Sequence, residues 1–572
     1  MFRLDTRRYR RSRMLNQNGT EDAGEVSAFH DSRNKFIEGK QIMKIIVAEK
    51  IAASAVDLLR EPGWTILTAD QVEGKLEQEL ATADALIVRS AVQANAALLE
   101  HAKQLRVIGR AGVGVDNIEM EAATRKGIAV MNTPGANAVA VAEHTLALML
   151  AMARHLCRAN ETMHAGKWEK KSLQGTELRA KTLGVIGLGK IGLEVARRAR
   201  AFGMEVVAHD PYVSSTVAQQ EKIRMGTVEE VYAAADYLSL HVGLTPQTAG
   251  MINEKSIAQM KKGVRIVNCA RGELILEADL AAAIASGKVA GAALDVFEKE
   301  PLKGSPLTGL ANVLLTPHVA GSTNEAQDAV GVQIAQQVKE YLKHGVIQNA
   351  VNVPSVSHEE YQELEPYILL AERLGAFLSQ ATDGNVEGIS LEYRGQLAEW
   401  KTDLVRNAAV MGILNRTLEE KANVVNAASI AASRGIAVLE SKEAKGKGGA
   451  GNVLSVVLKT KSAERGVKGA VLRGKSPRLL SVDAIDIEAP LGKDLLYLRN
   501  KDVPGVIGQV GTILGKHNIN IGDFSLGRDE TSGGKVREAI AVVHVDSPVN
   551  EVVLQELRKM DAVKEARAIQ LF

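Results

Sequence analysis

Residues 182–210 read TLGVIGLGKIGLEVARRARAFGMEVVAHD, and this stretch decides the fold. An apolar, strand-like run leads into the pattern G-x-G-x-x-G at Gly187, Gly189 and Gly192, and a helix-like run follows. In this context the glycines allow a tight turn, close approach of the backbone to a pyrophosphate, and close packing of helix on strand. Free N–H groups at the helix N-terminus attract the same anion. A Gly-rich turn without a ligand is the alternative, but the flanking strand and helix favour a dinucleotide site.

The next strand ends at Asp210, eighteen positions after Gly192. A carboxylate at about this spacing accepts hydrogen bonds from the adenosine ribose and would repel a 2′-phosphate. The pattern therefore predicts NAD rather than NADP as cofactor. The other interpretation is a solvated turn aspartate before Pro211.

Strand-like and helix-like segments alternate on both sides of this stretch, from Lys44 to His318, which predicts two α/β units with parallel sheets. The character changes after Val351, where a polar linker precedes a third domain of mixed helices and strands. From about Ala489 the order becomes βαββαβ, the ferredoxin-like arrangement. The expected fold class is therefore α/β with two doubly wound domains, an α+β domain and a ferredoxin-like domain.

The composition agrees with several globular domains, because 572 residues with 46% apolar side chains exceed what one core usually organises. Lysine and arginine (70) nearly balance aspartate and glutamate (68), so we expect no nucleic-acid partner. We also expect no membrane span, since no run of about 20 apolar residues occurs. Two cysteines, Cys157 and Cys269, exclude a disulfide framework and favour the cytoplasm. No metal site is predicted.

Residues 1–42 differ from the rest, with the Arg-rich opening RRYRRSR at Arg7 and no apolar periodicity. We expect a disordered extension and a folded core that begins at Met43. A transit peptide is the alternative, but several acidic residues argue against a targeting helix.

Three later segments deliver different polar groups after apolar strands: Arg271 in NCARG, Glu300 in DVFEKEP and His318 in TPH. Parallel sheets bind ligands at such strand ends. A guanidinium can hold a carboxylate at two points, and an imidazole can take a hydroxyl proton while hydride leaves for the nicotinamide. Glu300 would orient the imidazole and favour its protonated form. Singly, each residue also fits a structural role; together they predict the oxidation of a 2-hydroxy acid.

These motifs resemble the D-2-hydroxyacid dehydrogenase family from Met43 onward. The resemblance implies that Arg271, Glu300 and His318 are the catalytic residues. It also implies a substrate domain formed by residues 43–139 and 322–351 around an NAD-binding Rossmann domain of residues 140–321. The cofactor contacts that it implies, besides the glycines and Asp210, are Lys190, Ile191, Val242, Cys269, Ala270, Asp295 and Gly321. Asp295 would then lie near the nicotinamide amide.

Within the family, the chain resembles the members that oxidise 3-phosphoglycerate to 3-phosphohydroxypyruvate, the first step of L-serine biosynthesis. The motifs that carry this resemblance are LIVRSA at Leu86, GRAGVGVDNI at Gly109, NTPGANAVAVAEH at Asn132 and GKWEKK at Gly166. Arg89 and Arg110 would then face the carboxylate and phosphate of the substrate. Val113 stands where some relatives have Thr, which puts one cofactor hydrogen bond in doubt.

The C-terminal half is similar to the regulatory part of the long-form members. Residues 355–488, with VVNAASIAASRGI at Val424, resemble an intervening domain. Residues 489–572, with NKDVPGVIGQVGTILGKHNINI at Asn500, resemble an ACT domain that senses a small molecule. The resemblance implies a homotetramer and L-serine as effector, bound through Asn500, Asp502 and, across a dimer, Asn520.

The sequence also allows two other functions. A glyoxylate or hydroxypyruvate reductase, or another D-2-hydroxyacid dehydrogenase, would share the three catalytic residues. Such a reductase needs neither a phosphate-binding basic site nor two regulatory domains. A non-enzymatic NAD-sensing corepressor scaffold would keep the dinucleotide site, but its C-terminal tail would not resemble an ACT domain.

Overall fold

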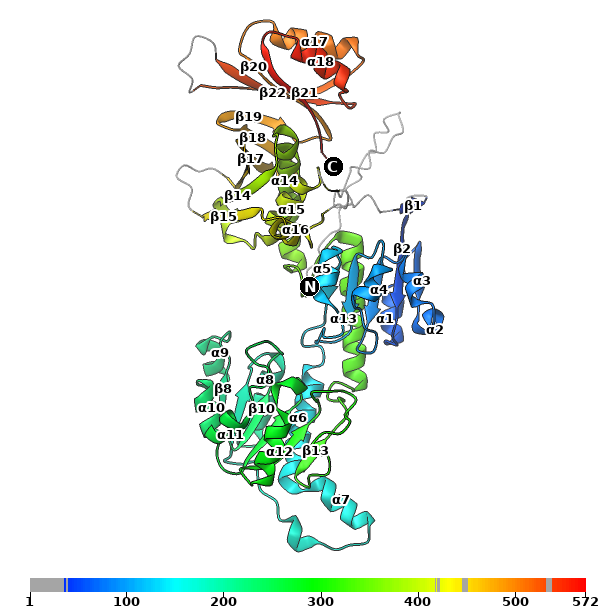
Figure 1. Ribbon diagram of the computed structural model, residues 1–572, viewed down its shortest axis with the longest axis vertical. Helices are drawn as coiled ribbons and strands as arrows, with labels where there is room; N and C mark the ends of the chain where they lie inside the picture. Colours follow the sequence, from blue (N-terminus) through cyan, green and yellow to red (C-terminus); the bar gives the residue numbers. More distant parts are fainter. Residues whose placement is uncertain are drawn as a thin grey trace, which may run out of the picture.

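The computed structural model describes residues 35–37, 40–416, 418, 422–444, 451–530 and 537–571, and these form four sheets. Figure 1 shows the sheets following one another along the molecule. The C-terminal sheet lies at one end, in orange and red, and the sheet that carries the G-x-G-x-x-G motif lies at the other end, in cyan and green. Residues 1–34 of the expected extension lie outside the described part. No helix in the described ranges is long and apolar enough to span a membrane.

The first sheet has the order β3-β2-β4-β5-β6 with all these strands parallel, and a short antiparallel strand, β1, pairs with β2. Its strands are β1 (Lys35–Ile37), β2 (Lys40–Val47), β3 (Trp64–Leu67), β4 (Ala85–Val88), β5 (Val107–Arg110) and β6 (Ala129–Met131). Its short helices are α1 (Ala53–Leu58), α2 (Ala69–Val72), α3 (Leu76–Leu80), α4 (Ala96–Glu100) and α5 (Met120–Arg125). Strand β2 thus begins before the expected core start at Met43.

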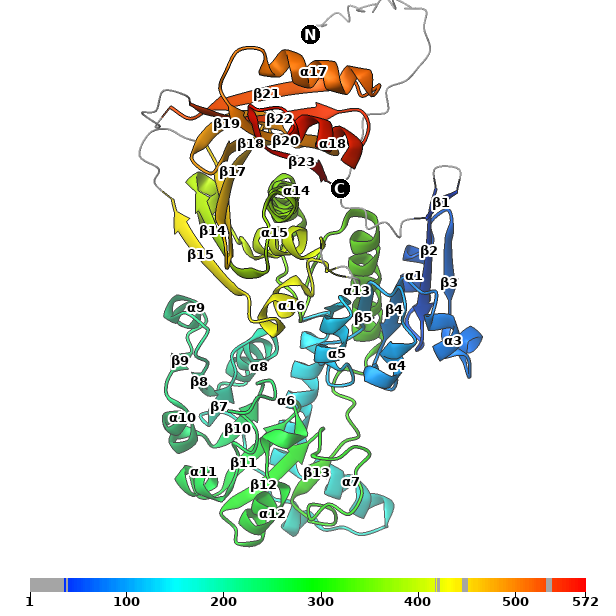
Figure 2. The same cartoon turned by 45° about the horizontal axis from the view of Figure 1, so that its top comes forward.

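A helix from much later in the chain, α13 (Asn324–His344), packs on this first sheet (Figure 2). Gly109 on β5 permits the contact, since a Cβ there would lie 2.8 Å from both Ile334 and Val338. The chain thus returns to its first sheet after the second one is complete. The family resemblance implies such a substrate domain made of two separate segments. The residue boundaries of the domains stay a prediction.

The second sheet carries the glycine motif and has the order β13-β12-β11-β10-β7-β8-β9, with every pairing parallel. Its order reverses between β7 and β10, and such a switch point opens a crevice at the carboxyl ends of the strands. The strands are β7 (Thr182–Ile186), β8 (Glu205–His209), β9 (Arg224–Met225), β10 (Tyr237–Leu240), β11 (Val264–Asn268), β12 (Val289–Leu294) and β13 (Val313–Leu315). The helices are α6 (Ala138–Arg154), α7 (Leu156–His164), α8 (Lys190–Ala201), α9 (Ser215–Gln220), α10 (Val228–Ala234), α11 (Glu254–Gln259) and α12 (Glu277–Ala285).

The third sheet has the order β15-β14-β16-β17-β18-β19 and is antiparallel except for the pair β14 and β15. Helices α14 (His358–Ala381) and α15 (Asp403–Leu414) pack closely against each other. A Cβ on Gly375 of α14 would lie 2.2 Å from the carbonyl oxygen of Ala409 on α15. The strands are β14 (Val386–Arg394), β15 (Ala437–Glu443), β16 (Val453–Thr460), β17 (Glu464–Leu472), β18 (Ser476–Val482) and β19 (Ile485–Pro490). The helices are α14 (His358–Ala381), α15 (Asp403–Leu414) and α16 (Ala427–Ser433).

The fourth sheet confirms the expected βαββαβ order. Its strand order β21-β22-β20-β23 is the ferredoxin-like one, in which the first and third strands of the unit are central. The elements are β20 (Asp494–Lys501), α17 (Val506–Lys516), β21 (Ile521–Arg528), β22 (Glu538–Val545), α18 (Glu551–Arg558) and β23 (Val563–Gln570).

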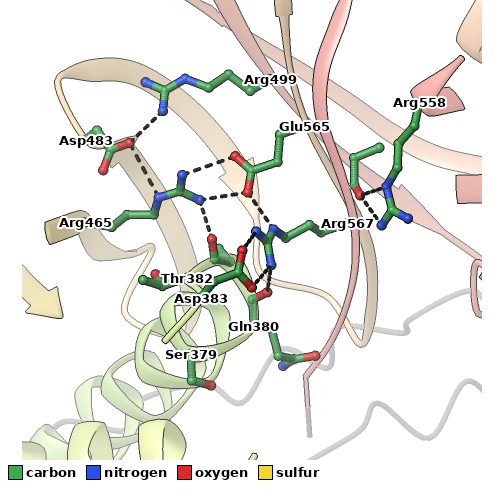
Figure 3. Close-up of polar contacts among 12 residues, drawn as sticks. Ser379, Gln380, Thr382, Asp383, Arg465, Asp483, Arg499, Arg558, Glu565 and Arg567 are labelled. Atoms are coloured by element: carbon green, nitrogen blue, oxygen red, sulfur yellow. Dashed lines mark hydrogen bonds and ion pairs between the residues drawn. The ribbon is translucent and has the colours of Figure 1, made fainter. Parts of the chain in front are cut away.

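The third and fourth sheets share an interface that is both apolar and charged. The rings of Phe377 on α14 and Tyr497 on β20 meet edge to face, with centroids 5.5 Å apart. Beside them, Arg465 forms a 3.1 Å ion pair with Glu565, and Arg567 forms a 2.5 Å ion pair with Asp383 (Figure 3). Buried side chains of both sheets belong to one hydrophobic cluster. The two C-terminal units are therefore packed as one body.

Candidate active site

The glycine loop between β7 and α8 has the geometry that its sequence predicts. Gly187 has φ +91°, a conformation that other residues rarely adopt, and a Cβ on Gly192 would lie 2.0 Å from the carbonyl oxygen of Gly187. A Cβ on Gly189, which caps α8, would meet nothing within 4 Å. The turn and the helix packing therefore need glycine, while the open space at Gly189 leaves the helix N-terminus accessible to a pyrophosphate.

Asp210 lies at the end of β8 and supports this loop from the neighbouring strand. Its carboxylate accepts hydrogen bonds from the backbone N–H of Leu188 and of Tyr212, both at 2.8 Å. A carboxylate has about four acceptor sites, so these two bonds leave capacity for ribose hydroxyls. The structure thus adds a role that the sequence did not indicate: Asp210 also holds the glycine loop.

His318 and Glu300 are brought together as a pair. The Nδ1 atom of His318 lies 2.8 Å from a carboxylate oxygen of Glu300. The His318 side chain is 53% exposed, so the rest of its ring is open to a ligand. Its backbone has φ +54°, and its N–H donates to the carbonyl oxygens of Asp295 (2.8 Å) and Thr316 (3.0 Å). The loop after β13 therefore holds this histidine in a conformation that is costly for a residue with a Cβ.

Asp295 is the residue that holds this loop in place. It is fully buried, and its carboxylate accepts hydrogen bonds from the Thr316 hydroxyl (2.6 Å) and from the backbone N–H of Val319 and Ala320 (both 2.9 Å). His144 Nε2 on α6 approaches it to 3.5 Å. Burial opposes ionisation most strongly, but these donors together hold the pKa of Asp295 below its ordinary value. The contact of Asp295 with a nicotinamide amide stays a prediction. Its hydrogen bonds to the loop that carries His318 are observed.

Arg271 follows β11 and faces the first sheet. Its guanidinium lies 3.0 Å from the carboxylate of Asp116, in the loop after β5, and also donates to the carbonyl oxygen of Ala270 at 2.6 Å. The buried amide of Asn268 fixes this loop, since it donates to the Arg271 carbonyl oxygen (2.7 Å) and accepts from the Ala270 N–H (3.0 Å). Sequence reasoning missed Asn268, although a polar residue ending an apolar strand is the signal that would have found it.

The two other predicted arginines lie on the first sheet. Arg110 ends β5; its pKa is lowered, first by burial and then by repulsion from Arg271, so the two guanidiniums share one region. Arg89 follows β4 in a loop that Glu49 fixes by accepting from its backbone N–H at 2.8 Å. Asn117 donates to the Arg89 carbonyl oxygen at 3.0 Å. Glu49 and Asn117 were not predicted, because their role depends on contacts between separate loops.

The remaining predicted cofactor residues lie in segments that follow β7, β10, β11 and β13. Lys190 Nζ donates to the carbonyl oxygen of Pro134 at 2.9 Å, so it links α8 to the segment before α6. Burial raises the pKa of Cys269 to about 12, which agrees with a structural role for this thiol. The other predicted positions in this group are Ile191, Val242, Ala270 and Gly321. Their contact with NAD stays a prediction.

One partly buried histidine beside the glycine loop escaped sequence reasoning. His241 follows β10, and its carbonyl oxygen would lie 2.5 Å from a Cβ on Gly187. Its Nε2 lies 2.8 Å from the Ser239 hydroxyl, and burial lowers its pKa to about 4. The backbone carbonyl of His241 therefore lies against the dinucleotide loop, while its neutral imidazole is held by Ser239.

The sequence matches three family models in the order of the observed units. Residues 146–320 match the NAD-binding domain of D-isomer specific 2-hydroxyacid dehydrogenases, residues 363–483 match the D-3-phosphoglycerate dehydrogenase intervening domain, and residues 495–562 match the ACT domain. The D-3-phosphoglycerate dehydrogenase of Methanocaldococcus jannaschii is 40% identical over 531 residues, which cover 93% of this chain and 100% of that protein. This chain belongs to the D-3-phosphoglycerate dehydrogenase family.

A second member of the D-3-phosphoglycerate dehydrogenase family, from Synechocystis, is 38% identical over 92% of this chain and 95% of its own. A solved glyoxylate reductase from Paecilomyes thermophila is 30% identical, with a TM-score of 0.50, but it covers 54% of this chain and 98% of its own. The relatives that match nearly the whole of this chain are thus D-3-phosphoglycerate dehydrogenases, whereas the solved glyoxylate reductase matches about half of it. The expected fold class, the NAD cofactor and the two C-terminal resemblances are confirmed.

Proposed function

We propose that this chain oxidises D-3-phosphoglycerate to 3-phosphohydroxypyruvate with NAD in the cytoplasm, as the first step of L-serine biosynthesis. The single observation that carries the proposal is the His318–Glu300 pair, at 2.8 Å, near the dinucleotide crevice of an NAD-binding domain. The names of the full-length relatives support the substrate. Arg89, Arg110 and Arg271 supply positive charge for a substrate with two anionic groups.

The residues of this chain divide the chemistry between binding and proton transfer. Arg271 holds the substrate carboxylate, while Arg89 and Arg110 receive the remaining negative charge. His318 takes the proton of the C2 hydroxyl as the C2 hydride leaves and the carbonyl forms, and the Glu300 carboxylate stabilises the imidazolium. NAD⁺ supplies the hydride acceptor. Asp295 acts through the loop it supports, because its carboxylate is bonded to that loop.

Substrate selection tests the proposed activity. NADH formation, followed by absorbance, is expected from D-3-phosphoglycerate at much higher kcat/KM than from lactate, glycerate or 2-hydroxyglutarate. A preference for reducing glyoxylate or hydroxypyruvate would favour the reductase alternative instead. Absence of turnover with every substrate, while NAD still binds, would favour the scaffold alternative.

Cofactor choice depends on Asp210. We expect Asp210→Ala to raise the NADP-to-NAD ratio of kcat/KM, since the like charge that repels a 2′-phosphate is removed; each tenfold change corresponds to about 1.4 kcal/mol. Asp210→Asn is the closer variant, because its amide oxygen can still accept from the Leu188 N–H, while the charge and the acceptor for the Tyr212 N–H are lost. A wild-type enzyme that uses both cofactors equally would contradict this role.

The surface of the second unit supports a homo-oligomer, for which we propose a tetramer. Helix α7 has no buried residue, and Leu156 (53%), Met163 (56%) and Trp168 (79%) are exposed on it and in the segment after it. Large apolar side chains gathered on a protruding segment are typical of a protein interface. Light scattering on the intact chain measures the mass, and Trp168→Ala is expected to weaken the assembly.

For the ACT domain we propose L-serine as the effector. Asp502, after β20, pairs with Arg528 at 3.1 Å, so an incoming ammonium group would take over this carboxylate from Arg528. Asn500 lies at the same end of the sheet, while Asn520 precedes β21 at the opposite end and donates to Asp546 at 2.7 Å. The proposal therefore takes Asn520 from a second copy of the domain, which the opposite placement of the two asparagines supports.

Calorimetric titration with serine tests this effector. Heat and inhibition are expected at millimolar serine or below for wild type, and Asp502→Ala is expected to lose both because the ammonium partner is gone. D-serine serves as the matched ligand. No heat and no inhibition with wild type would leave the domain with a role in assembly alone.

A further inference from the structure

Asp116 is a charged residue beside the proposed substrate-binding arginine Arg271, and the proposed reaction assigns it no role. It lies in the loop after β5, and its carboxylate is 3.0 Å from the guanidinium of Arg271. The two residues come from different sheets, the first and the second. The Asp116 side chain is 66% exposed, while that of Arg271 is 26% exposed. The carboxylate thus reaches the catalytic arginine from the solvent side.

The loop that carries Asp116 is shaped around guanidinium groups. A Cβ on Gly114 would lie 1.9 Å from a terminal nitrogen of Arg271 and 2.8 Å from the Asp116 carboxylate. A Cβ on Gly112 would lie 1.4 Å from a terminal nitrogen of Arg110. A side chain at either position would push a guanidinium aside, so the two glycines let the arginines lie directly against this loop. The contact between Asp116 and Arg271 belongs to a shaped site rather than to a chance meeting of surface charges.

The charges around Asp116 explain why a carboxylate is useful there in the ligand-free enzyme. Arg110 is partly buried near Arg271. Burial and then repulsion from Arg271 lower the pKa of Arg110, and Asp116 and then Glu49 oppose this shift. A substrate carboxylate on Arg271 would supply the same negative charge at the same place. Asp116 and the substrate therefore compete for one guanidinium.

We propose that Asp116 is an internal stand-in for the substrate carboxylate, which occupies Arg271 in the empty enzyme and is displaced when the substrate binds. The inference rests on the proposed function, since it takes Arg271 as the carboxylate-binding residue. An ion pair with this exposure is weak, so a substrate with two anionic groups displaces it readily. A small inorganic or organic anion with less charge gains less from the exchange. Asp116 therefore reduces unproductive occupation of Arg271 at a modest cost in substrate affinity.

The test compares Asp116→Asn with wild type and with Glu121→Gln, which removes an exposed carboxylate of the same unit at the start of α5. We expect Asp116→Asn to lower the KM for 3-phosphoglycerate by about two- to fivefold at low salt, as expected for removal of a weak competing ion pair. The inhibition constant of malonate, a non-reactive dicarboxylate, falls by a similar factor. Glu121→Gln changes neither value, and the KM for NAD changes in neither variant.

An unchanged or raised KM in Asp116→Asn would overturn the proposal, because it would mean that Asp116 only orients Arg271 or does nothing. An equal fall of KM in Glu121→Gln would also overturn it, since the effect would then be general electrostatics. Malonate binding measured by calorimetry needs no turnover. A wild-type enzyme inactive on 3-phosphoglycerate would reject the proposed function, while tighter malonate binding by Asp116→Asn would still support the inference.

Discussion

Replacing His318 by alanine is expected to lower kcat by about two to four orders of magnitude, the usual contribution of a general base. The imidazole that pairs with Glu300 at 2.8 Å is lost, and the C2 hydroxyl then has to release its proton to water. The affinity for NAD is expected to change little, because the glycine loop and Asp210 are untouched. Stopped-flow and steady-state NADH formation, with NAD affinity from fluorescence titration, measure both quantities.

A matched control exists in the same chain. His101 is 50% exposed and lies 3.6 Å from Glu77, much as His318 is 53% exposed and lies beside Glu300. His101→Ala is therefore expected to keep wild-type turnover. Glu300→Gln keeps a side chain of the same shape and removes the charge, so a smaller loss of kcat is expected. Near-native turnover of His318→Ala would show that another group takes the proton.

The second large effect is expected for Arg271. Arg271→Ala removes two charge-assisted hydrogen bonds to the substrate carboxylate, each worth about 1.5–3 kcal/mol, so kcat/KM is expected to fall by about two to four orders of magnitude. Arg271→Lys keeps the charge but loses the planar, two-point contact, and partial activity is expected. Steady-state kinetics over a wide range of 3-phosphoglycerate concentrations separates KM from kcat.

Arg60 offers the comparison for this prediction, since it forms an exposed 3.0 Å ion pair with Asp57 and lies outside the crevice residues described above. Arg60→Ala is expected to leave kcat/KM unchanged. If Arg271→Ala lowered only the affinity for NAD and left the response to substrate intact, its assignment to the substrate carboxylate would be wrong.

The sequence by itself determined the parts of this protein that depend on local patterns. Gly187 and Gly192 stand in the order that a strand, a tight turn and a helix require, so the dinucleotide loop could be predicted from eleven consecutive letters. Strand-end residues such as Asp210 and His318 could be placed at one edge of the sheet, because parallel strands joined by right-handed crossovers all end there. The ferredoxin-like order of the last unit followed from its element order in the same way.

Only the tertiary structure decided how residues distant in sequence support one another. Asp295 was expected at the cofactor, yet its buried carboxylate holds the loop that gives His318 its left-handed backbone. Asp116 meets Arg271 from another sheet, and Arg465 meets Glu565 across the interface of the two C-terminal units. Such pairs leave no periodic signal, because each partner lies in a loop or strand whose local pattern is satisfied without the other. Their free energy arises from burial and charge that exist only after the sheets have packed.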